Sequence, residues 1–463
     1  MARVLLLVPA RTYRATDFLV AAGRLGLDVV VGSDGALALD RRLVVRVDPG
    51  DLEASVDRLL ARSGPVDAVV AVDTPMLVLA AAVAARMGLT HNRVEAVRAA
   101  ADKATQRRRW AAAGVAQPAF RILPADASTG ALKKAAAQVG FPCVVKAVSL
   151  SGSQGVLRAD DERGAAAAVA RIRQVLGVAG RPADEPVLVE AYVPGWELSV
   201  DGLLTDGELT VTTIFDKPDT PEGPTFEETL LVTPSRLAQP ILSEALRAAE
   251  RAAGALGLRY GPIHAELRLD ARNHRRQPTM LELAARSIGG LCSRALRFLD
   301  GVSLEQLVLA NALGRQVTPH RLARPAGVLM LPVERAGVLQ AVHGTAQAAA
   351  VAGITGLSIT TALGQTVHPL PEGDRYLGFL FAEGATHQEV EEALRDGTVQ
   401  AVVLFPVDFT SDFLEDGQVS LDLRLEGSNP TSSAPGTRLW YQAVSSGRVD
   451  PWWPHTNSVG TES

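Results

Sequence analysis

Cysteine and aromatic residues are scarce in this sequence of 463 residues. Its two cysteines, Cys143 and Cys292, lie far apart among apolar or small residues. This spacing argues against a disulfide framework and predicts two buried thiols in a cytoplasmic protein. Aromatic residues make up only 5% of the chain, whereas alanine is abundant, and this composition favours helix-rich α/β packing over an aromatic-rich β-sandwich.

The chain also lacks long apolar runs and a strong net charge. No uninterrupted apolar stretch reaches the roughly 20 residues that a membrane-spanning helix needs, and the apolar run within the first nine residues is too short for a signal peptide. A net charge of −5 gives no sign of the basic surface that nucleic-acid binding favours. The sequence therefore predicts a protein that binds neither membranes nor nucleic acids.

Strand and helix patterns alternate through residues 1–98. Strands are expected at residues 4–8, 29–32 and 68–72, and helices at residues 15–25, 52–61 and 77–87. Such alternation predicts a Rossmann-like parallel sheet with helices on both faces, whose ligands bind beyond the carboxyl ends of the strands. The loop after the first strand lacks the Gly-x-Gly-x-x-Gly pattern, so no dinucleotide site is expected there.

The whole chain predicts a multidomain protein of mixed α/β and α+β class. A connecting helix is expected over residues 93–113. Changes in pattern and composition divide the chain into residues 1–98, 99–117, 118–194, 195–324, 325–411 and 412–463. The fifth segment is expected to be a C-terminal α/β domain. The last segment is rich in Ser, Thr, Pro and Gly, and we expect it to be partly disordered.

Two glutamates lie on either side of a polar segment near the middle of the chain. Glu266 and Glu282 each belong to a β-like apolar run, and residues 270–278 between them are typical of a turn, so a hairpin would place the carboxylates side by side. Like charges held together cost energy unless a cation lies between them. Mg²⁺ is typically bound by one or two carboxylates together with substrate phosphates. The pair therefore indicates a phosphate-handling enzyme, with a solvated hairpin as the alternative.

A second pattern combines a lysine with a loop of glycine and serine. Lys146 ends a buried strand, and residues 149–155 follow with three serines and two glycines. Backbone N–H groups in such loops form anion-binding concavities, and a lysine adds a point charge for phosphate oxygens. The pattern indicates a phosphate site, although an ordinary turn after a surface lysine would look the same.

A third pattern is an apolar strand that ends in a Pro-Gly hinge. Glu190 lies in the strand, and Glu197 follows the hinge in an alternating strand. An adenine ring needs apolar walls and a backbone edge with one donor and one acceptor, which an extended hinge provides, and a carboxylate beyond it can accept ribose hydroxyls. The pattern fits a nucleoside site, and solvent-facing glutamates are the alternative.

Together with Lys103 in the connecting helix, these patterns resemble the ATP-grasp superfamily over about residues 1–410. The resemblance implies that a lid module at residues 118–194 and a core module at residues 195–324 clamp ATP between them. It implies these nucleotide-binding residues: Lys103 and Lys146 for phosphates, Ser151, Gly152, Ser153 and Gly155 over the triphosphate, Glu190, Ala191 and Val193 for adenine, and Glu197 for ribose. It also implies that Glu266 and Glu282 hold Mg²⁺, as two ions, or Mn²⁺ in its place.

Within the superfamily, the chain resembles the carboxylate–amine ligases of the L-amino acid ligase, or dipeptide synthase, type. The resemblance lies in residues 226–235, 286–290, 337–339 and 376–384. It implies ATP-dependent formation of an amide or peptide bond, through an acyl phosphate, from a small carboxylate and an amine, amino acids among them. The implied catalytic residues are Lys146 and Arg286, and the implied substrate residues are Glu228, Arg286, Gly289 and Gly290. Dimers are common in the family, and a homodimer is one expectation for this chain.

Two positions depart from the family pattern. Ala284 stands where ATP-grasp enzymes usually carry an asparagine, and Leu231 stands where dipeptide-forming members tend to carry a histidine. His264 is a candidate substitute for that histidine, although a structural histidine with satisfied hydrogen bonds is the favoured interpretation. Two alternatives stay open: a carboxylase-type enzyme that activates bicarbonate, and an ATP-binding module without catalysis.

Overall fold

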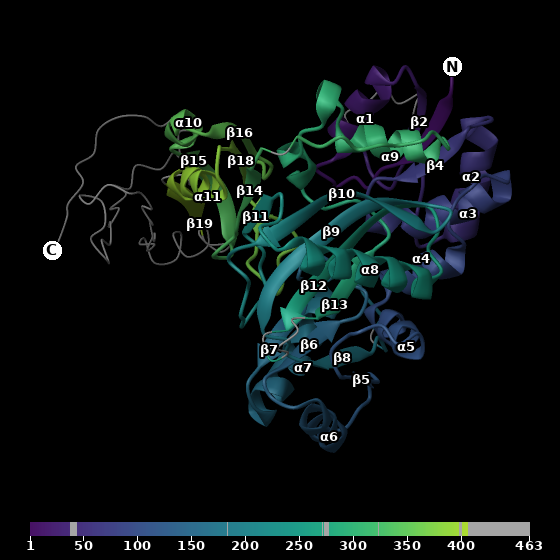
Figure 1. The fold of residues 1–463 in the computed structure, drawn as a ribbon. Helices are drawn as coiled ribbons and strands as arrows, with labels where there is room; N and C mark the ends of the chain where they lie inside the picture. The colour runs from purple at the N-terminus through teal and green to yellow at the C-terminus, as the bar shows by residue number, and fades with distance from the viewer. Residues whose placement is uncertain are drawn as a thin grey trace, which may run out of the picture.

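The computed structural model describes residues 1–37, 44–182, 184–270, 272, 277–322, 324–397 and 401–405. In this part of the chain, a parallel N-terminal sheet, a small antiparallel sheet and a C-terminal group of strands and helices surround one long sheet (Figure 1). The expected tail at residues 412–463 and most of the expected turn at residues 270–278 lie outside the described residues. No helix within the described ranges is long and apolar enough to cross a membrane.

The N-terminal unit has the parallel sheet that the sequence predicted. Its strands run in the order β3-β2-β1-β4 and all pair in parallel. Leu5, Leu6 and Leu7 of β1 are fully buried, as expected for a strand covered on both faces. The elements are β1 (Arg3–Leu7), α1 (Ala15–Arg24), β2 (Asp28–Ser33), β3 (Val44–Arg46), α2 (Leu52–Ser63), β4 (Ala68–Ala71), the 3₁₀ turn η2 (Thr74–Met76) and α3 (Leu77–Met87). The short strand β3 was not predicted.

The connecting segment forms two helices, so the prediction of one helix over residues 93–113 was wrong. α4 (Val94–Ala101) ends at Asp102, and α5 (Lys103–Ala112) starts directly after it. The carboxylate of Asp102 accepts a hydrogen bond from the backbone N–H of Thr105 at 2.6 Å. This N-cap favours a new helix start over a continuous helix. The backbone N–H of Lys103 donates to Val148 O at 3.0 Å, which joins α5 to the next unit.

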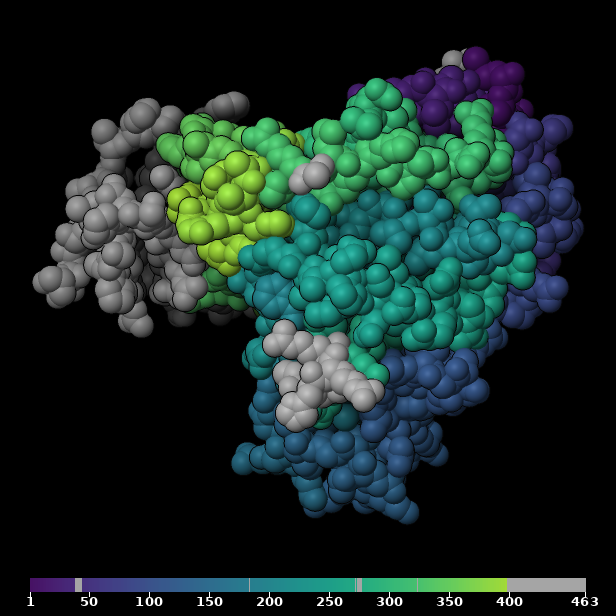
Figure 2. Space-filling model, viewed as in Figure 1, coloured from purple at the N-terminus to yellow at the C-terminus, as the bar shows by residue number. Residues whose placement is uncertain are grey.

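The lid unit is built on a small antiparallel sheet with strand order β5-β8-β6-β7. Val145 and Val189 on the sheet pack with Ile172 and Leu176 of a long helix in one apolar core. The elements are β5 (Phe120–Leu123), α6 (Thr129–Val139), β6 (Cys143–Ala147), β7 (Val156–Ala159), α7 (Glu162–Val178) and β8 (Val187–Ala191). Figure 2 shows this unit as a lobe that projects from the body of the molecule.

The central sheet has eight strands in the order β13-β12-β9-β10-β11-β14-β18-β16. Its first part and the elements around it are β9 (Gly195–Thr205), β10 (Glu208–Lys217), β11 (Leu230–Thr233), α8 (Gln239–Leu256), β12 (Gly261–Asp270), β13 (Pro278–Ala284), η3 (Cys292–Ala295), η4 (Leu299–Gly301) and α9 (Leu304–Ala312). Ala248 and Ala252 of α8 share an apolar core with Ala80 and Ala84 of α3. The N-terminal unit and the central sheet therefore form one packed body.

The C-terminal segment contributes three strands to the central sheet. β14, β16 and β18 extend that sheet, whereas β15, β17 and β19 form a separate three-stranded sheet. The elements are β14 (Ala326–Leu331), β15 (Gly337–His343), α10 (Thr345–Ala350), β16 (Ile354–Ile359), β17 (Thr366–Val367), β18 (Gly378–Glu383), α11 (His387–Asp396) and β19 (Ala401–Phe405). The sequence alone did not indicate that strands of this segment belong to the central sheet. That residues 325–411 form a separate domain stays a prediction.

Candidate functional site

A cavity of about 170 Å³ lies where the lid sheet faces the central sheet. The residues that the sequence singled out and that line it are Lys103, Lys146, Gly152, Ser153, Glu190, Ala191, Val193, Glu197, Glu228, Glu266, Glu282, Arg286, Gly289 and Gly290. Ser151 and Gly155 are not among the lining residues. The N–H of Gly155 instead donates to Pro371 O at 3.1 Å. The fold thus brings nearly all the predicted site residues to one place, while their roles stay predictions.

The expected hairpin is formed by the antiparallel strands β12 and β13, on which Glu266 lies directly opposite Glu282. The register shifts just after Glu266. Glu282 lies 3.2 Å from Lys103 Nζ. Ala284, at the end of β13, also lines the cavity. The carboxylate pair is therefore on the cavity wall and not on a solvated face.

On the lid side, Glu190 holds two cations. Lys146 Nζ lies 2.9 Å from one carboxylate oxygen, and Arg107 Nε donates to the other. Burial by itself raises the pKa of Glu190, but the charges of Arg107 and Lys146 outweigh it and lower the pKa to about 2. Glu190 is therefore ionised, and it fixes Lys146 at the cavity.

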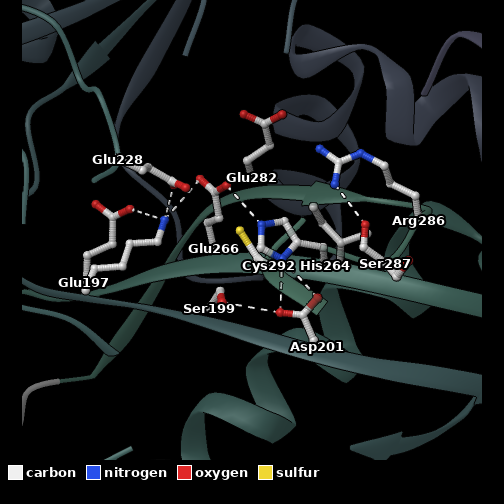
Figure 3. A network of polar contacts seen from close by, with 12 residues as sticks. Glu197, Ser199, Asp201, Glu228, His264, Glu266, Glu282, Arg286, Ser287 and Cys292 are labelled. Carbon is white, nitrogen blue, oxygen red and sulfur yellow. Dashed lines mark hydrogen bonds and ion pairs between the residues drawn. The ribbon is translucent and has the colours of Figure 1, made fainter. Parts of the chain in front are cut away.

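Three carboxylates converge at the other end of the cavity, on Glu197, Glu228 and Glu266 (Figure 3). One oxygen of each lies within 4.8 Å of the others. The buried ammonium of Lys217 lies 2.6 Å from Glu197 and 3.9 Å from Glu266, and it also donates to Glu228. Glu197 in addition accepts from Arg268 Nε at 2.7 Å. One lysine thus holds three acidic groups together.

The protonation of this cluster follows from its charges. Burial would lower the pKa of Lys217, but the charges of Glu197, Glu228 and Glu266 raise it well above its usual value. For Glu197 and Glu266 burial is outweighed by Lys217, and the pKa of each is lowered. For Glu228, burial and the neighbouring carboxylates prevail over Lys217, and the pKa is raised. Of the three acidic groups, Glu228 is therefore the one that most readily carries a proton.

His264 lies beneath this cluster and faces Asp201. Its Nδ1 is 3.1 Å from both Asp201 oxygens, and its Nε2 is 3.3 Å from Glu266 (Figure 3). Burial lowers the pKa of His264, but Asp201 and Glu266 raise it to about 9. The histidine is thus held between two carboxylates while it also lines the cavity, and its role as a substitute for the histidine that Leu231 replaces stays a prediction.

The turn after β13 forms the remaining wall. Arg286 donates from Nε to Thr74 Oγ1 at 3.1 Å and from Nη1 to Ser287 O at 2.9 Å. Gly290 has a φ of 59°, and a Cβ there would lie 2.6 Å from a ring carbon of Phe379. Glycine is therefore required at this position. Leu231, Cys292, Met330 and Tyr376 make the wall apolar in this region.

Sequence patterns missed four residues that organise the site. Arg107 and Arg268 were hidden because each becomes a partner of a glutamate only through tertiary contacts. Lys217 ends β10 and resembles an ordinary surface lysine in sequence, and Thr74 belongs to the distant N-terminal unit. The one available signal was alternation, because Lys217 continues the inward-facing positions Thr213 and Phe215 of β10.

Comparisons with known proteins agree with this geometry. Residues 139–295 match the ATP-grasp domain, and residues 329–399 match L-amino acid ligase C-terminal domain 2. The uncharacterised protein y4rH of Sinorhizobium fredii is 27% identical over 370 residues, which are 78% of this chain and 74% of that protein. Alanine–anticapsin ligase of Bacillus subtilis is 29% identical over 241 residues, 48% of this chain and 49% of the ligase. The chain therefore spans about half the length of that ligase.

A solved structure shows the same fold. The crystal structure of L-amino acid ligase from Bacillus licheniformis matches with a TM-score of 0.70 and 24% identity, over 86% of this chain and 97% of that one. The chain thus has the fold of that ligase and carries an ATP-grasp domain, and its similarity to alanine–anticapsin ligase supports a ligase that forms C–N bonds. Its C-terminal match is to a domain of the L-amino acid ligases, so the two matched domains are those that the sequence resemblance led us to expect. The predicted fold class and resemblance are both confirmed.

Proposed function

We propose that this protein is an ATP-dependent carboxylate–amine ligase that works through an acyl phosphate and releases ADP and phosphate. The observation that carries the proposal is a single cavity on which lysines, clustered carboxylates and an arginine converge. Phosphoryl transfer depends on positioning and charge neutralisation and needs no covalent nucleophile. The two cysteines fit this chemistry, because both are buried and burial raises the pKa of each thiol.

The nucleotide would lie between the two sheets. Lys103 and Lys146 would contact the phosphates, and the backbone of Ala191 and Val193 would hold adenine. The ion pair with Glu190 supports this role for Lys146, because it presents the ammonium to the cavity in a fixed position. Ribose binding by Glu197 requires it to share oxygens that already face Lys217 and Arg268.

ATP-grasp ligases typically use Mg²⁺, and the donor set fits this ion. Glu266 and Glu282 face each other across the hairpin, and hard carboxylate oxygens are the ligands that Mg²⁺ prefers. We propose that these two residues would hold the metal, as two ions, with Mn²⁺ as a substitute. Such ions neutralise charge on phosphate oxygens. The side chain of Ala284 offers no oxygen, so it would supply no ligand to the metal.

The reaction would proceed in two balanced steps. A carboxylate oxygen of the first substrate attacks the γ-phosphorus of ATP, and the bond from that phosphorus to the ADP oxygen breaks. The amine of the second substrate then attacks the acyl carbon, the bond to phosphate breaks, and the nitrogen loses a proton to the departing phosphate. Arg286 would stabilise charge on the transferred group, and the closed lid would exclude water that hydrolyses the intermediate.

The substrates we propose are small carboxylates and amines, amino acids among them. Glu228 would bind a substrate amino group, and Arg286, Gly289 and Gly290 would lie beside the carboxylate. Leu231 places an apolar side chain where dipeptide-forming relatives tend to carry histidine, which favours an apolar substrate over a polar one. The predicted homodimer remains part of this proposal.

The test measures ADP and phosphate release from ATP and Mg²⁺ with pools of amino acids, with bicarbonate, and with neither, together with product masses. Amino-acid-dependent release with a condensed product supports the ligase. Bicarbonate-dependent release would support the carboxylase alternative. Binding of ATP without turnover in any pool would support a non-catalytic module, the alternative that Ala284 favours.

Substitution of the metal ligand tests the same proposal. Glu282→Gln is nearly isosteric, and we expect it to lower Mg²⁺-dependent turnover by at least about a hundredfold while thermal unfolding stays near that of the wild type. Glu208→Gln, at an exposed position on β10, is the matched control and should leave turnover unchanged. Turnover of Glu282→Gln at the wild-type rate would rule out the metal assignment.

A further inference from the structure

Arg286 is held in place by the N-terminal unit, which belongs to a distant part of the chain. Its Nε donates to Thr74 Oγ1 at 3.1 Å and lies 3.9 Å from Asp73 Oδ1. Thr74 opens η2 directly beyond the carboxyl end of β4. Ligand sites usually form at the carboxyl edge of a parallel sheet. Here, a residue at that edge of the N-terminal sheet accepts a hydrogen bond from an arginine of the cavity.

A buried arginine fastens the two segments together. Arg14 is 1% exposed, and its Nη1 donates to Val72 O at 3.0 Å while its Nη2 donates to Ser287 Oγ. Arg14 also lies 3.7 Å from Asp73 Oδ1. The segment before Thr74 and the segment after Arg286 are thus tied to the same guanidinium. Asp73 serves as the counter-ion of both arginines.

These contacts leave part of Arg286 available to a ligand. A guanidinium has five N–H donors, of which the bonds to Thr74 and Ser287 O use two. The group lines the cavity, and the neighbouring Gly289, which also lines it, has no side chain to cover the guanidinium. Arginine loses substantial rotamer freedom when it is ordered. Because the hydrogen bonds to Thr74 and Ser287 order the Arg286 side chain before substrate binds, the reaction does not bear that entropic cost.

We propose that Thr74 and Asp73 are positioning residues for Arg286, so that the N-terminal unit completes the phosphoryl-transfer end of the site. The inference rests on the proposed function for the reaction that Arg286 serves. Because Thr74 touches Arg286 and is not among the residues that line the cavity, its loss acts on the rate of the chemical step and leaves ATP affinity unchanged. The N-terminal sheet is thereby a working part of the ligase.

The test compares Thr74→Val, which removes the hydroxyl at constant shape, with Thr74→Ser, which keeps it. We expect Thr74→Val to lower kcat about tenfold, with KM for ATP within about twofold of the wild type, because small displacements of a catalytic group cost this much or more. Thr74→Ser should restore most of the rate. Wild-type kcat in Thr74→Val would overturn the proposal.

A double-mutant cycle shows whether Thr74 acts through Arg286. In an Arg286→Lys background, Thr74→Val should lower kcat by less than about twofold further, since residues that act as a unit are not additive. A full additional tenfold loss would contradict the inference. Thr129→Val, at an exposed position on α6, controls for the substitution itself, and thermal unfolding of each variant controls for folding.

A measurement without turnover separates this inference from the proposed function. In protein with ¹⁵N-labelled arginine, the Nε–H signal of Arg286, assigned by its absence in Arg286→Lys, should exchange slowly with solvent. Thr74→Val should accelerate that exchange at least about tenfold, and Thr74→Ser should not. If the wild type turns over no substrate pair, the ligase proposal fails while this readout still stands. Equal exchange rates in wild type and Thr74→Val would refute the positioning role.

Discussion

Lys217 is the residue on which the acidic end of the cavity depends. Its ammonium contacts Glu197 and Glu228 and lies near Glu266, and it is almost fully buried. Removing one partner of a buried charge group leaves the others uncompensated, at a cost of about 3–5 kcal/mol. The cluster is therefore stable only with a cation at its centre.

Substitution of Lys217 tests this dependence. We expect Lys217→Met to lower the melting temperature strongly and millimolar Mg²⁺ to restore part of the loss, because a metal ion can take over the neutralisation of the carboxylates. Lys133→Met, which removes an exposed lysine 3.1 Å from Glu162, should change the melting temperature little. A melting temperature for Lys217→Met equal to that of the wild type would contradict the assignment.

Glu190 makes stability depend on pH. Its pKa falls from the ordinary value of 4.5 to about 2 in the folded protein. A lowered folded-state pKa contributes stability that is present above the unfolded pKa and lost as pH falls toward the folded one. The stability difference between wild type and Glu190→Gln should therefore be largest near neutral pH and shrink between about pH 4.5 and pH 2.

Denaturant unfolding across that pH range measures the difference. Glu162→Gln, a change of a half-exposed residue at the start of α7, is the matched control and should show no comparable trend. If the difference in free energy of unfolding between wild type and Glu190→Gln stays constant from neutral pH to pH 3, the ion pairs of Glu190 do not cause that difference.

At the scale of elements, the lid is joined to the C-terminal segment by the loop before β18. Gln154 Nε2 donates to Glu372 O at 2.7 Å, and Gly155 N–H donates to Pro371 O at 3.1 Å. Arg171 of α7 forms an ion pair with Glu372 at 2.6 Å. Because the same loop continues to Tyr376 in the cavity wall, the glycine-serine loop and that wall are held by one segment.

Loss of the side-chain bond should loosen the lid. We expect Gln154→Ala to speed amide hydrogen exchange in residues 149–155 and to raise KM for ATP a few-fold, because fewer contacts hold the loop closed. Gln388→Ala, on the exposed face of α11, should change neither quantity. Unaltered exchange in residues 149–155 would show that the loop is held by other contacts.

For the molecule as a whole, the C-terminal segment is part of the core. β11 pairs with β14 along its length, and Leu230 and Val232 pack with Leu380 of β18 and with Val390 of α11. Removing these partners exposes a strand edge and an apolar face at once. The central sheet therefore includes residues far beyond the ATP-grasp match.

Truncation tests this dependence. We expect a chain of residues 1–324 to aggregate or to lose cooperative unfolding, because burial of the β11 face is lost. Soluble yield, gel filtration and thermal unfolding by circular dichroism measure the outcome. A monomeric 1–324 chain that unfolds cooperatively near the wild-type temperature would show that the two parts are independent.

The order of local patterns along the chain determined the class of this protein. The alternation in residues 1–98, the lysine and glycine-serine loop at residues 146–155 and the glutamates at 266 and 282 were predictable because periodicity and turn residues act over short distances. The break at Asp102 was predictable in principle from its capping side chain, and it was missed. These local signals carried the nucleotide and metal predictions.

Tertiary structure alone decided which charges meet. Lys217 faces glutamates of three other strands or loops, and Arg107 meets Glu190 and Thr74 meets Arg286 across segments far apart in sequence. It also decided that β14, β16 and β18 complete the central sheet. The physical reason is that ion pairing and strand pairing depend on distance in space, which no local pattern encodes, whereas turns, caps and strand alternation are set by neighbouring residues.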